Sequence, residues 1–288
     1  GLWRDGYIIR RQGNAIVICG GRSSGTFHGA VAFLDRCCGV RFYMPTDLFT
    51  SLPADPRLAV SDLSLRVEPF VKSCFMSGIS RPFETVWARR VGAIRRLGGT
   101  HQHNMYHVFP ADKYAAERIE IYPILNGSRY IPKSQADQGW QPCFTEPKTL
   151  EAGVESALAH FNTRPDDLYL SFSIQDGSRF CECGRCLALV KAAEADDPKL
   201  GRTRAYSEMY WRFMNALAER VSEKLPDKRL TALAYGQTRL PPPFKLHPIL
   251  IIFTNFHIAE LPADNFMVAD AAGTSPLDQW LNLCSHYG

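Results

Sequence analysis

The sequence predicts an α/β protein in which a small α+β unit precedes a (β/α)8 TIM-type barrel that is incomplete at its C-terminal end. From about residue 70, strand-like segments alternate with helix-like ones, a pattern typical of a parallel sheet covered by helices. Polar residues directly follow the predicted strands, and in a barrel the chemistry lies at the carboxyl ends of the strands. These strand-end groups are His103-Asn104, Gln175-Asp176, Tyr235-Gly236-Gln237 and Asn255-Phe256-His257.

A doubly wound open sheet is the alternative for the same alternation. Its dinucleotide-binding form needs a Gly-x-Gly-x-x-Gly motif after a strand, and the chain has none. About six strands can be identified, whereas a complete barrel has eight strands in ~250 residues. We therefore expect the missing strands beyond residue 288. Both ends look cut, so a signal peptide is not expected to be visible in this piece.

Composition narrows the functional classes. The 288 residues contain 45% hydrophobic and 22% charged residues, which is typical of a globular protein. The net charge of +4 gives no argument for a nucleic acid as the main partner. No apolar run reaches the ~20 residues that a membrane helix needs, so we expect no membrane span.

Residues 1–50 predict a β-β-α-β unit, and the prolines within residues 51–69 predict a linker. The elements of this unit are a hairpin over 7–19, a helix over 27–38 and a strand over 40–44. Residues 70–288 form the predicted incomplete barrel. Its strands are expected over 71–76, 99–104, 168–174, 229–235 and 249–253. Its helices are expected over 84–97, 147–161, 204–223 and 276–284.

Asp176 is the candidate catalytic acid. The strand over 168–174 ends in Gln175-Asp176, followed by Gly177. A carboxylate in this place would project into the mouth of a barrel, partly desolvated, where it can donate a proton. Asp-Gly is also a common turn pair, and the spacing alone does not separate the two interpretations.

A histidine cluster indicates a polar wall of the site. Three of the eight histidines, His101, His103 and His107, lie within seven residues. Imidazole is a common metal ligand, but no Asp or Glu accompanies the cluster. A polar wall that binds substrate through His103, Asn104 and His107 is favoured over a metal site, and structural histidines are the remaining alternative.

The cysteines contain one conspicuous group, Cys181, Cys183 and Cys186, with C-x-C-x-x-C spacing. Three thiolates so close could hold zinc, but a tetrahedral site needs a fourth ligand, and no second C-x-x-C supplies one. Disulfide pairing is the rival interpretation. A structural clamp is favoured over catalysis in either case, and the sequence predicts no metal and no cofactor.

Aromatic residues near the predicted loop mouths indicate a carbohydrate site. Trp140 and Tyr235 are the two candidates for substrate binding, because aromatic faces stack on the apolar face of sugar rings. Ordinary core packing is at least as probable for each of them singly.

Two resemblances extend this interpretation. Residues Gly25 to Pro45 resemble the accessory α/β domain ahead of the barrel in β-hexosaminidases and α-glucuronidases. The rest resembles the bacterial family called domain of unknown function 4838. The segments that carry this second resemblance are His103–Pro110, Asn126–Arg129, Gln141–Pro147, Ser173–Gly177 with Cys181-x-Cys-x-x-Cys186, and Leu233–Thr238.

The resemblance implies a (β/α)8 glycoside hydrolase exported by bacteria. Some members are classed as glycoside hydrolase family 163, endo-β-N-acetylglucosaminidases that act on N-glycans. In the hexosaminidase relatives an Asp-Glu pair ends the fourth barrel strand, and Gln175-Asp176 looks like its counterpart. The expected substrate is a glycan containing N-acetylhexosamine or uronic acid. A non-catalytic carbohydrate-binding protein with a degenerate barrel is the alternative, and a zinc-dependent hydrolase is a third.

Overall fold

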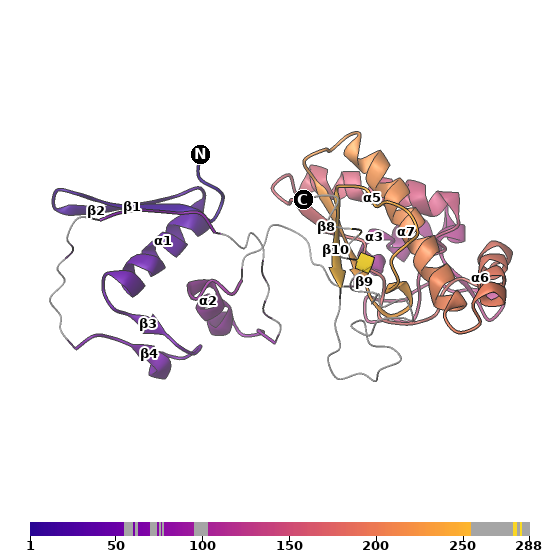
Figure 1. Cartoon of the computed structure of the whole chain (residues 1–288), viewed down its shortest axis with the longest axis horizontal. Coiled ribbons are helices and arrows are strands. Elements are labelled where there is room, and N and C mark those ends of the chain that lie inside the picture. The colour runs from indigo at the N-terminus through magenta and orange to yellow at the C-terminus, as the bar shows by residue number, and fades with distance from the viewer. Residues whose placement is uncertain are drawn as a thin grey trace. The chain divides into compact units, whose positions relative to one another are not determined.

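The computed structural model describes residues 1–54, 60, 63–69, 74, 76, 78–94, 103–254, 279, 280 and 283. The chain divides into two compact units, Gly1–Leu97 and Gly98–Gly288 (Figure 1). Among the helices that the structure describes, none combines the length and the apolar character needed to span a lipid bilayer.

The first unit is built on a hairpin. Strands β1 (Tyr7–Gln12) and β2 (Ala15–Gly20) pair antiparallel around a two-residue turn, and Gly13 supplies the positive φ of 59° that such a turn requires. This confirms the predicted hairpin. Helix α1 (Ser23–Arg36) lies along the sheet (Figure 1) and confirms the predicted helix. Gly29 allows this close approach, because a Cβ there would lie 2.6 Å from Ile18 Cγ2.

The first unit is longer than the sequence predicts. Strand β5 (Ser64–Val67) lies inside the predicted linker, yet it pairs with the free edge of β1 to give the sheet order β2-β1-β5. Its alternating exposed and half-buried residues are those of a strand with one covered face. The short strands β3 (Arg41–Phe42) and β4 (Thr50–Ser51), with the 3-10 turn η1 (Asp47–Phe49) between them, complete this part. The predicted linker over residues 51–69 is therefore wrong at 64–67.

Helix α2 (Pro82–Arg90), expected to be the first barrel helix, also belongs to the first unit. Its Trp87 Nε1 donates to the Phe42 carbonyl at 3.0 Å, and the Arg90 guanidinium lies 4.9 Å from the centre of the Phe42 ring. These contacts attach α2 to the first unit, and the two compact units divide between residues 97 and 98, later than the predicted boundary near 70.

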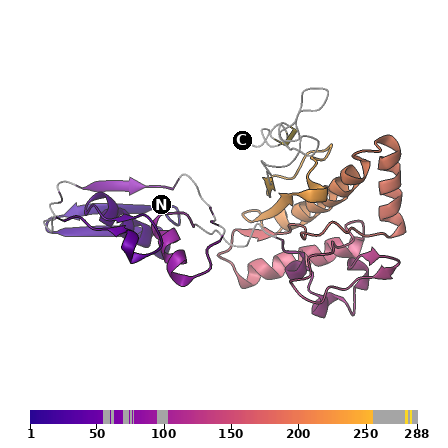
Figure 2. The same cartoon turned by 90° about the horizontal axis from the view of Figure 1, so that it is seen from below.

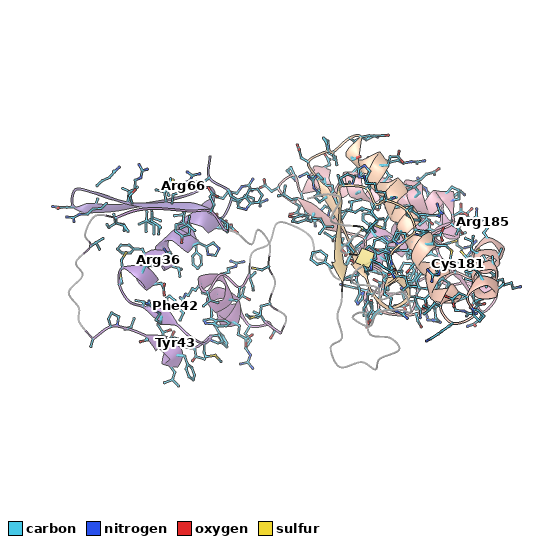
Figure 3. The ribbon with its side chains drawn as sticks, viewed as in Figure 1. Arg36, Phe42, Tyr43, Arg66, Cys181 and Arg185 are labelled. Atoms are coloured by element: carbon cyan, nitrogen blue, oxygen red, sulfur yellow. The ribbon has the colours of Figure 1, made fainter. Side chains whose placement is uncertain are left out.

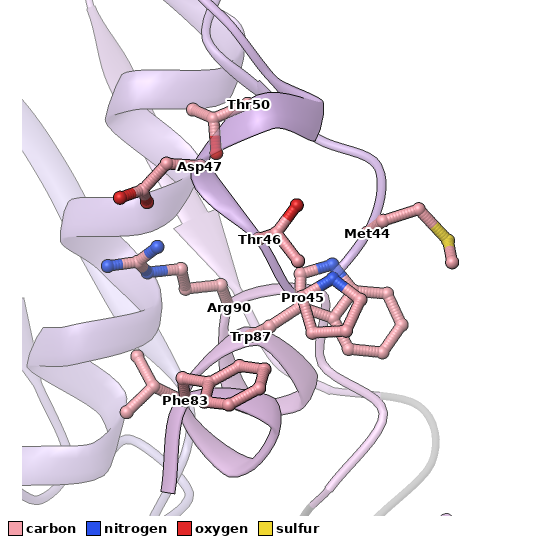
Figure 4. A pocket seen from close by; sticks show the side chains of 9 residues that line it. Met44, Pro45, Thr46, Asp47, Thr50, Phe83, Trp87 and Arg90 are labelled. Atoms are coloured by element: carbon pink, nitrogen blue, oxygen red, sulfur yellow. The ribbon is translucent and has the colours of Figure 1, made fainter. Parts of the chain in front are cut away.

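An open hollow of about 420 Å³ lies within the first unit, between the β3–β4 connection and α2 (Figure 4). Its wall is mostly apolar and contains one carboxylate and one guanidinium. The lining residues are Met44, Pro45, Thr46, Asp47, Thr50, Phe83, Val86, Trp87 and Arg90. This hollow is formed entirely by residues of the first unit.

The second unit contains the parallel sheet that the sequence predicts. Strands β8 (Tyr169–Ser171), β9 (Arg229–Ala234) and β10 (Leu250–Thr254) run parallel in the order β10-β9-β8. Consecutive strands are neighbours, as they are in a barrel and in each half of a doubly wound sheet. Within the described residues the sheet is open and three-stranded, and no closed barrel is present.

The second unit also contains three long helices. They can be followed in Figure 2. They are α5 (Pro147–Thr163), α6 (Gly184–Asp196) and α7 (Gly201–Ser222). α7 packs against both of the others, and its aromatic residues join a core of rings. Phe144, for example, lies with its ring centre 5.2 Å from Tyr210 and 5.3 Å from Phe213. Burial of these large side chains, at ~25 cal/mol per Å² of apolar surface, is the main stabilisation of the unit.

Shorter elements precede α5. They are α3 (Met105–Val108), α4 (Ala111–Tyr114), the turn η2 (Ile119–Ile121) and the hairpin of β6 (Ile124–Leu125) and β7 (Ser128–Arg129). A further 3-10 turn, η3 (Gly236–Thr238), follows β9. The predicted helices over 147–161 and 204–223 and the strands over 229–235 and 249–253 are confirmed. The predicted strands over 71–76 and 99–104 and the helix over 276–284 lie mostly outside the described residues.

Candidate functional site

Three polar side chains meet beyond the carboxyl ends of β8 and β9. Tyr235, which directly follows β9, donates its hydroxyl to Asp176 Oδ1 at 2.7 Å. His103 Nε2 lies 3.6 Å from the same carboxylate oxygen. The rings of His103 and Tyr235 stand next to each other, with their centres 5.7 Å apart. The parallel sheet thus brings together three of the residues that the sequence predicts for the site.

The hydrogen bonds of His103 fix which ring nitrogen faces Asp176. Its Nδ1 lies 2.5 Å from the Ile174 carbonyl oxygen. A carbonyl oxygen can only accept, so Nδ1 is assigned the proton and Nε2 is directed at the carboxylate.

The site is open to solvent. The side chain of Asp176 is 55% exposed and that of His103 is 29% exposed. A ligand that reaches Asp176 would therefore meet a carboxylate already hydrogen-bonded on one oxygen by a tyrosine. Asn255, Phe256 and His257, which the sequence places at the end of the next strand, lie outside the described residues.

The loop carrying Asp176 is held by a second segment, residues 137–141. Gln141 is fully buried, and its carboxamide bonds both ways with the backbone of Gln175: it accepts from the Gln175 N–H at 2.9 Å and donates to the Gln175 carbonyl at 2.9 Å. It also donates to the Gly177 carbonyl at 2.8 Å. The Gly177 N–H in turn donates to the Gln138 carbonyl at 2.7 Å. These bonds fix the backbone on both sides of Asp176.

Gly177 is required by this close approach. A Cβ at this position would lie 2.4 Å from the Gln138 carbonyl oxygen and 2.7 Å from Gly139 Cα. Gly177 is not one of the residues with positive φ, so the pair Asp176-Gly177 does not owe its glycine to a left-handed turn conformation. This weakens the turn interpretation that the sequence left open.

The side chains of Gln175 and Asn104 form hydrogen bonds with the backbone near the site. Gln175 is only 1% exposed, and its side-chain oxygen accepts from the Met105 N–H at 3.2 Å. Asn104 donates through Nδ2 to the Ser171 carbonyl at 2.8 Å. Both side chains connect the start of α3 to the segment that follows β8, and Gln175 Nε2 also donates to the Asp137 carbonyl at 3.4 Å.

Trp140 and His107, two predicted substrate-binding residues, are not among the side chains that contact Asp176 in the described residues. Trp140 is fully buried, its ring centre lies 5.8 Å from that of Tyr122, and its Nε1 donates to the Asp137 carbonyl. It has no exposed face on which a sugar could stack, so its predicted role is corrected to that of a core residue. His107 is exposed on α3, where its ring lies beside Tyr106, with 5.9 Å between the ring centres.

The predicted cysteine group gains a fourth member. The sulfur atoms of Cys143, Cys181, Cys183 and Cys186 all lie within 4.8 Å of one another. Figure 3 shows Cys181 and Arg185 beside α6, at the side of the second unit where this group lies. Cys143 could not be identified from spacing, because it lies far from the other three in the chain and outside any C-x-x-C pattern.

One comparison with known proteins covers the second unit as far as residue 286 and also the last part of the first unit. Residues 73–286 match a single family, described as "Domain of unknown function (DUF4838)". Neither the comparison with curated proteins nor the comparison with solved structures finds a match. The matched range includes Asp176, His103, Tyr235 and the four clustered cysteines. The chain belongs to the DUF4838 family.

Proposed function

We propose that this protein is a glycoside hydrolase in which Asp176 is the general acid/base. The observation that carries the proposal is the contact of Tyr235 and His103 with one oxygen of Asp176, beyond the carboxyl ends of parallel strands. The strand-end position is where α/β enzymes bind their substrates. The resemblance of the flanking segments to carbohydrate-active enzymes supports a glycan containing N-acetylhexosamine or uronic acid as the substrate.

The proposed chemistry needs one proton at Asp176. The protonated carboxyl gives its proton to the glycosidic oxygen while the bond from that oxygen to the anomeric carbon breaks, and an oxocarbenium-like transition state develops. A water molecule then adds to the anomeric carbon and returns a proton to the carboxylate. In a substrate with an N-acetyl group, the acetamide oxygen bonds to the anomeric carbon as the glycosidic bond breaks, and the water then displaces that oxygen from the anomeric carbon. Tyr235 holds the carboxylate through its hydroxyl, and His103 Nε2 is placed to accept a hydrogen bond from a sugar hydroxyl.

We also propose that β8, β9 and β10 belong to a (β/α)8 barrel. Their consecutive parallel order supports this architecture. The segment at His103 and Asn104 adds to it, because the Asn104 N–H donates to the Ser173 carbonyl at 3.2 Å, on the side of β8 away from β9. That position is the one expected for the preceding strand of a barrel.

A non-catalytic glycan-binding protein is the second candidate. Among the described residues, the group around Asp176 brings in one carboxylate, whereas most glycosidases use a pair. This candidate predicts glycan binding without turnover.

The deciding experiment compares Asp176→Asn with the unmodified protein in the full-length chain. Release of N-glycans and turnover of aryl glycosides are measured, together with the melting temperature. We expect a loss of about 10²-fold or more, the usual contribution of a general acid/base, with no change in folding. Asp196→Asn is the control, because Asp196 is an exposed carboxylate at the end of α6, and this variant keeps full activity. Full turnover in a folded Asp176→Asn variant removes Asp176 from its role, and glycan binding without turnover in the unmodified protein supports the second candidate.

A further inference from the structure

The four clustered sulfur atoms lie within 4.8 Å of one another, and two of their separations match the edge of a tetrahedral zinc site. Cys143 Sγ lies 3.8 Å from Cys183 Sγ and 3.8 Å from Cys186 Sγ. Zinc–sulfur bonds of ~2.3 Å place the corners of a tetrahedron ~3.8 Å apart. Disulfides would instead hold the sulfur atoms in two pairs at ~2.05 Å. We propose that Cys143, Cys181, Cys183 and Cys186 bind one zinc ion.

Hydrogen-bond donors surround the cluster in the manner of a second coordination shell. The Thr145 hydroxyl lies 3.2 Å from Cys186 Sγ and 3.4 Å from Cys143 Sγ. The backbone N–H of Ile124 donates to Cys181 Sγ at 3.4 Å. Such donors orient thiolate ligands and offset their negative charge.

The start of α6 adds a favourable field. Cys183 is the N-cap of this 13-residue helix, and Cys186 lies in its first turn. The positive end of the helix dipole therefore faces the cluster and stabilises thiolates there. Two of the four ligands are in this way set by one helix start, which explains the C-x-x-C spacing of Cys183 and Cys186.

The site is closed, which indicates a structural role. Cys143, Cys181 and Cys186 are each at most 3% exposed. Four protein thiolates fill a tetrahedral coordination sphere and leave no position for a catalytic water. A zinc ion bound in this way would stabilise the structure, and it would not take part in a hydrolase reaction.

The clamp would join the two segments that hold Asp176. Cys143 follows Gln141, and Cys181 follows the loop of Asp176 and Gly177. Between the two ends, Arg179 Nε donates to the Gly139 carbonyl at 2.7 Å. Beyond them, Arg185 pairs with Glu146. One zinc ion would thus hold the two segments together at one end, and the hydrogen bonds at their other end position the Asp176 carboxylate. This holds for any reaction in which Asp176 takes part.

The test is metal analysis of the full-length protein, expressed with zinc and purified without chelators. We expect about one zinc per chain, and less than about a fifth of an equivalent in Cys143→Ser, together with a lower melting temperature. Cys19→Ser is the matched control, because Cys19 is an exposed cysteine in β2, and this variant keeps its zinc.

If Cys143→Ser does not fold, the zinc assignment is tested on the unmodified protein. Replacement of zinc by cobalt(II) gives the absorption spectrum of tetrahedral cobalt bound to four thiolates, as the proposal requires. Disulfides between these cysteines in the native protein, or one equivalent of iron, would overturn the assignment. The Asp176→Asn variant keeps the metal, so failure of the proposed hydrolase activity and failure of the zinc site give different results.

Discussion

Gly177→Ala tests whether Asp176 is positioned by the contact between two chain segments. The added methyl group would lie 2.4 Å from the Gln138 carbonyl oxygen, whereas ordinary contact begins at 3.4 Å. The two segments would have to separate by about 1 Å, and close-packed structure resists such a shift. Separation on this scale breaks the bonds that Gly177 makes to the Gln138 carbonyl and to the Gln141 side chain.

The size of the effect follows from those bonds. Each is worth about 1 kcal/mol, and leaving the buried Gln141 amide unsatisfied costs about 1–3 kcal/mol more. We therefore expect the free energy of unfolding to fall by about 3–5 kcal/mol. If the glycine served only a turn, the same substitution would change it by about 1 kcal/mol or less.

Urea unfolding of the full-length protein, followed by tryptophan fluorescence, measures this difference. Gly184→Ala is the control, because a Cβ at Gly184, the first residue of α6, meets nothing within 4 Å. It should be neutral or slightly stabilising. A loss below about 0.5 kcal/mol in Gly177→Ala would refute the reasoning and return Asp176-Gly177 to the turn interpretation.

Two further predictions concern the body of the second unit. Burial lowers the pKa of His160 below its usual range, an effect that Asp167, 3.0 Å away, partly offsets and that Arg164 and Lys228 reinforce. The folded state therefore binds this proton less readily than the unfolded chain, and acidification below about pH 6.5 lowers the free energy of unfolding. Unfolding curves at pH 7.5 and 5.5 measure this loss, which should be smaller in His160→Gln. Trp140→Phe removes the hydrogen bond to the Asp137 carbonyl and some core volume. It should lower the free energy of unfolding by about 1–3 kcal/mol and leave the affinity for glycans unchanged. Weaker glycan binding by the folded variant would show that Trp140 contributes to the site.

The elements that the sequence predicts well have strong periodic patterns. α5 and α7 carry apolar residues at helical spacing, and β9 is a continuous buried run. The prolines around β5 predict a linker, and only the pairing of β5 with β1 makes it a strand. α6 is not among the predicted helices, because it lacks a clear apolar stripe: its Leu187 and Leu189 are exposed.

The site follows the same division. Asp176, Tyr235 and His103 could be predicted because the carboxyl ends of parallel strands meet at one edge of a sheet. Gln141 and Cys143 could not, because their contacts join segments more than 30 residues apart that have no periodic pattern. Their positions depend on how the loop before α5 folds against the loop after β8.

The dipeptide His103-Asn104 has a consequence for the behaviour of the chain in solution. The Asn104 side chain and N–H occupy the carbonyl groups of Ser171 and Ser173, on the edge of the β8 segment away from β9, and His103 Nδ1 occupies that of Ile174. An uncovered edge strand is a template for pairing with other chains, and proteins protect such edges. Among the described residues, these two therefore cover part of this edge and also present an imidazole to the site, so the protection of a sheet edge and the geometry around Asp176 are linked through one dipeptide.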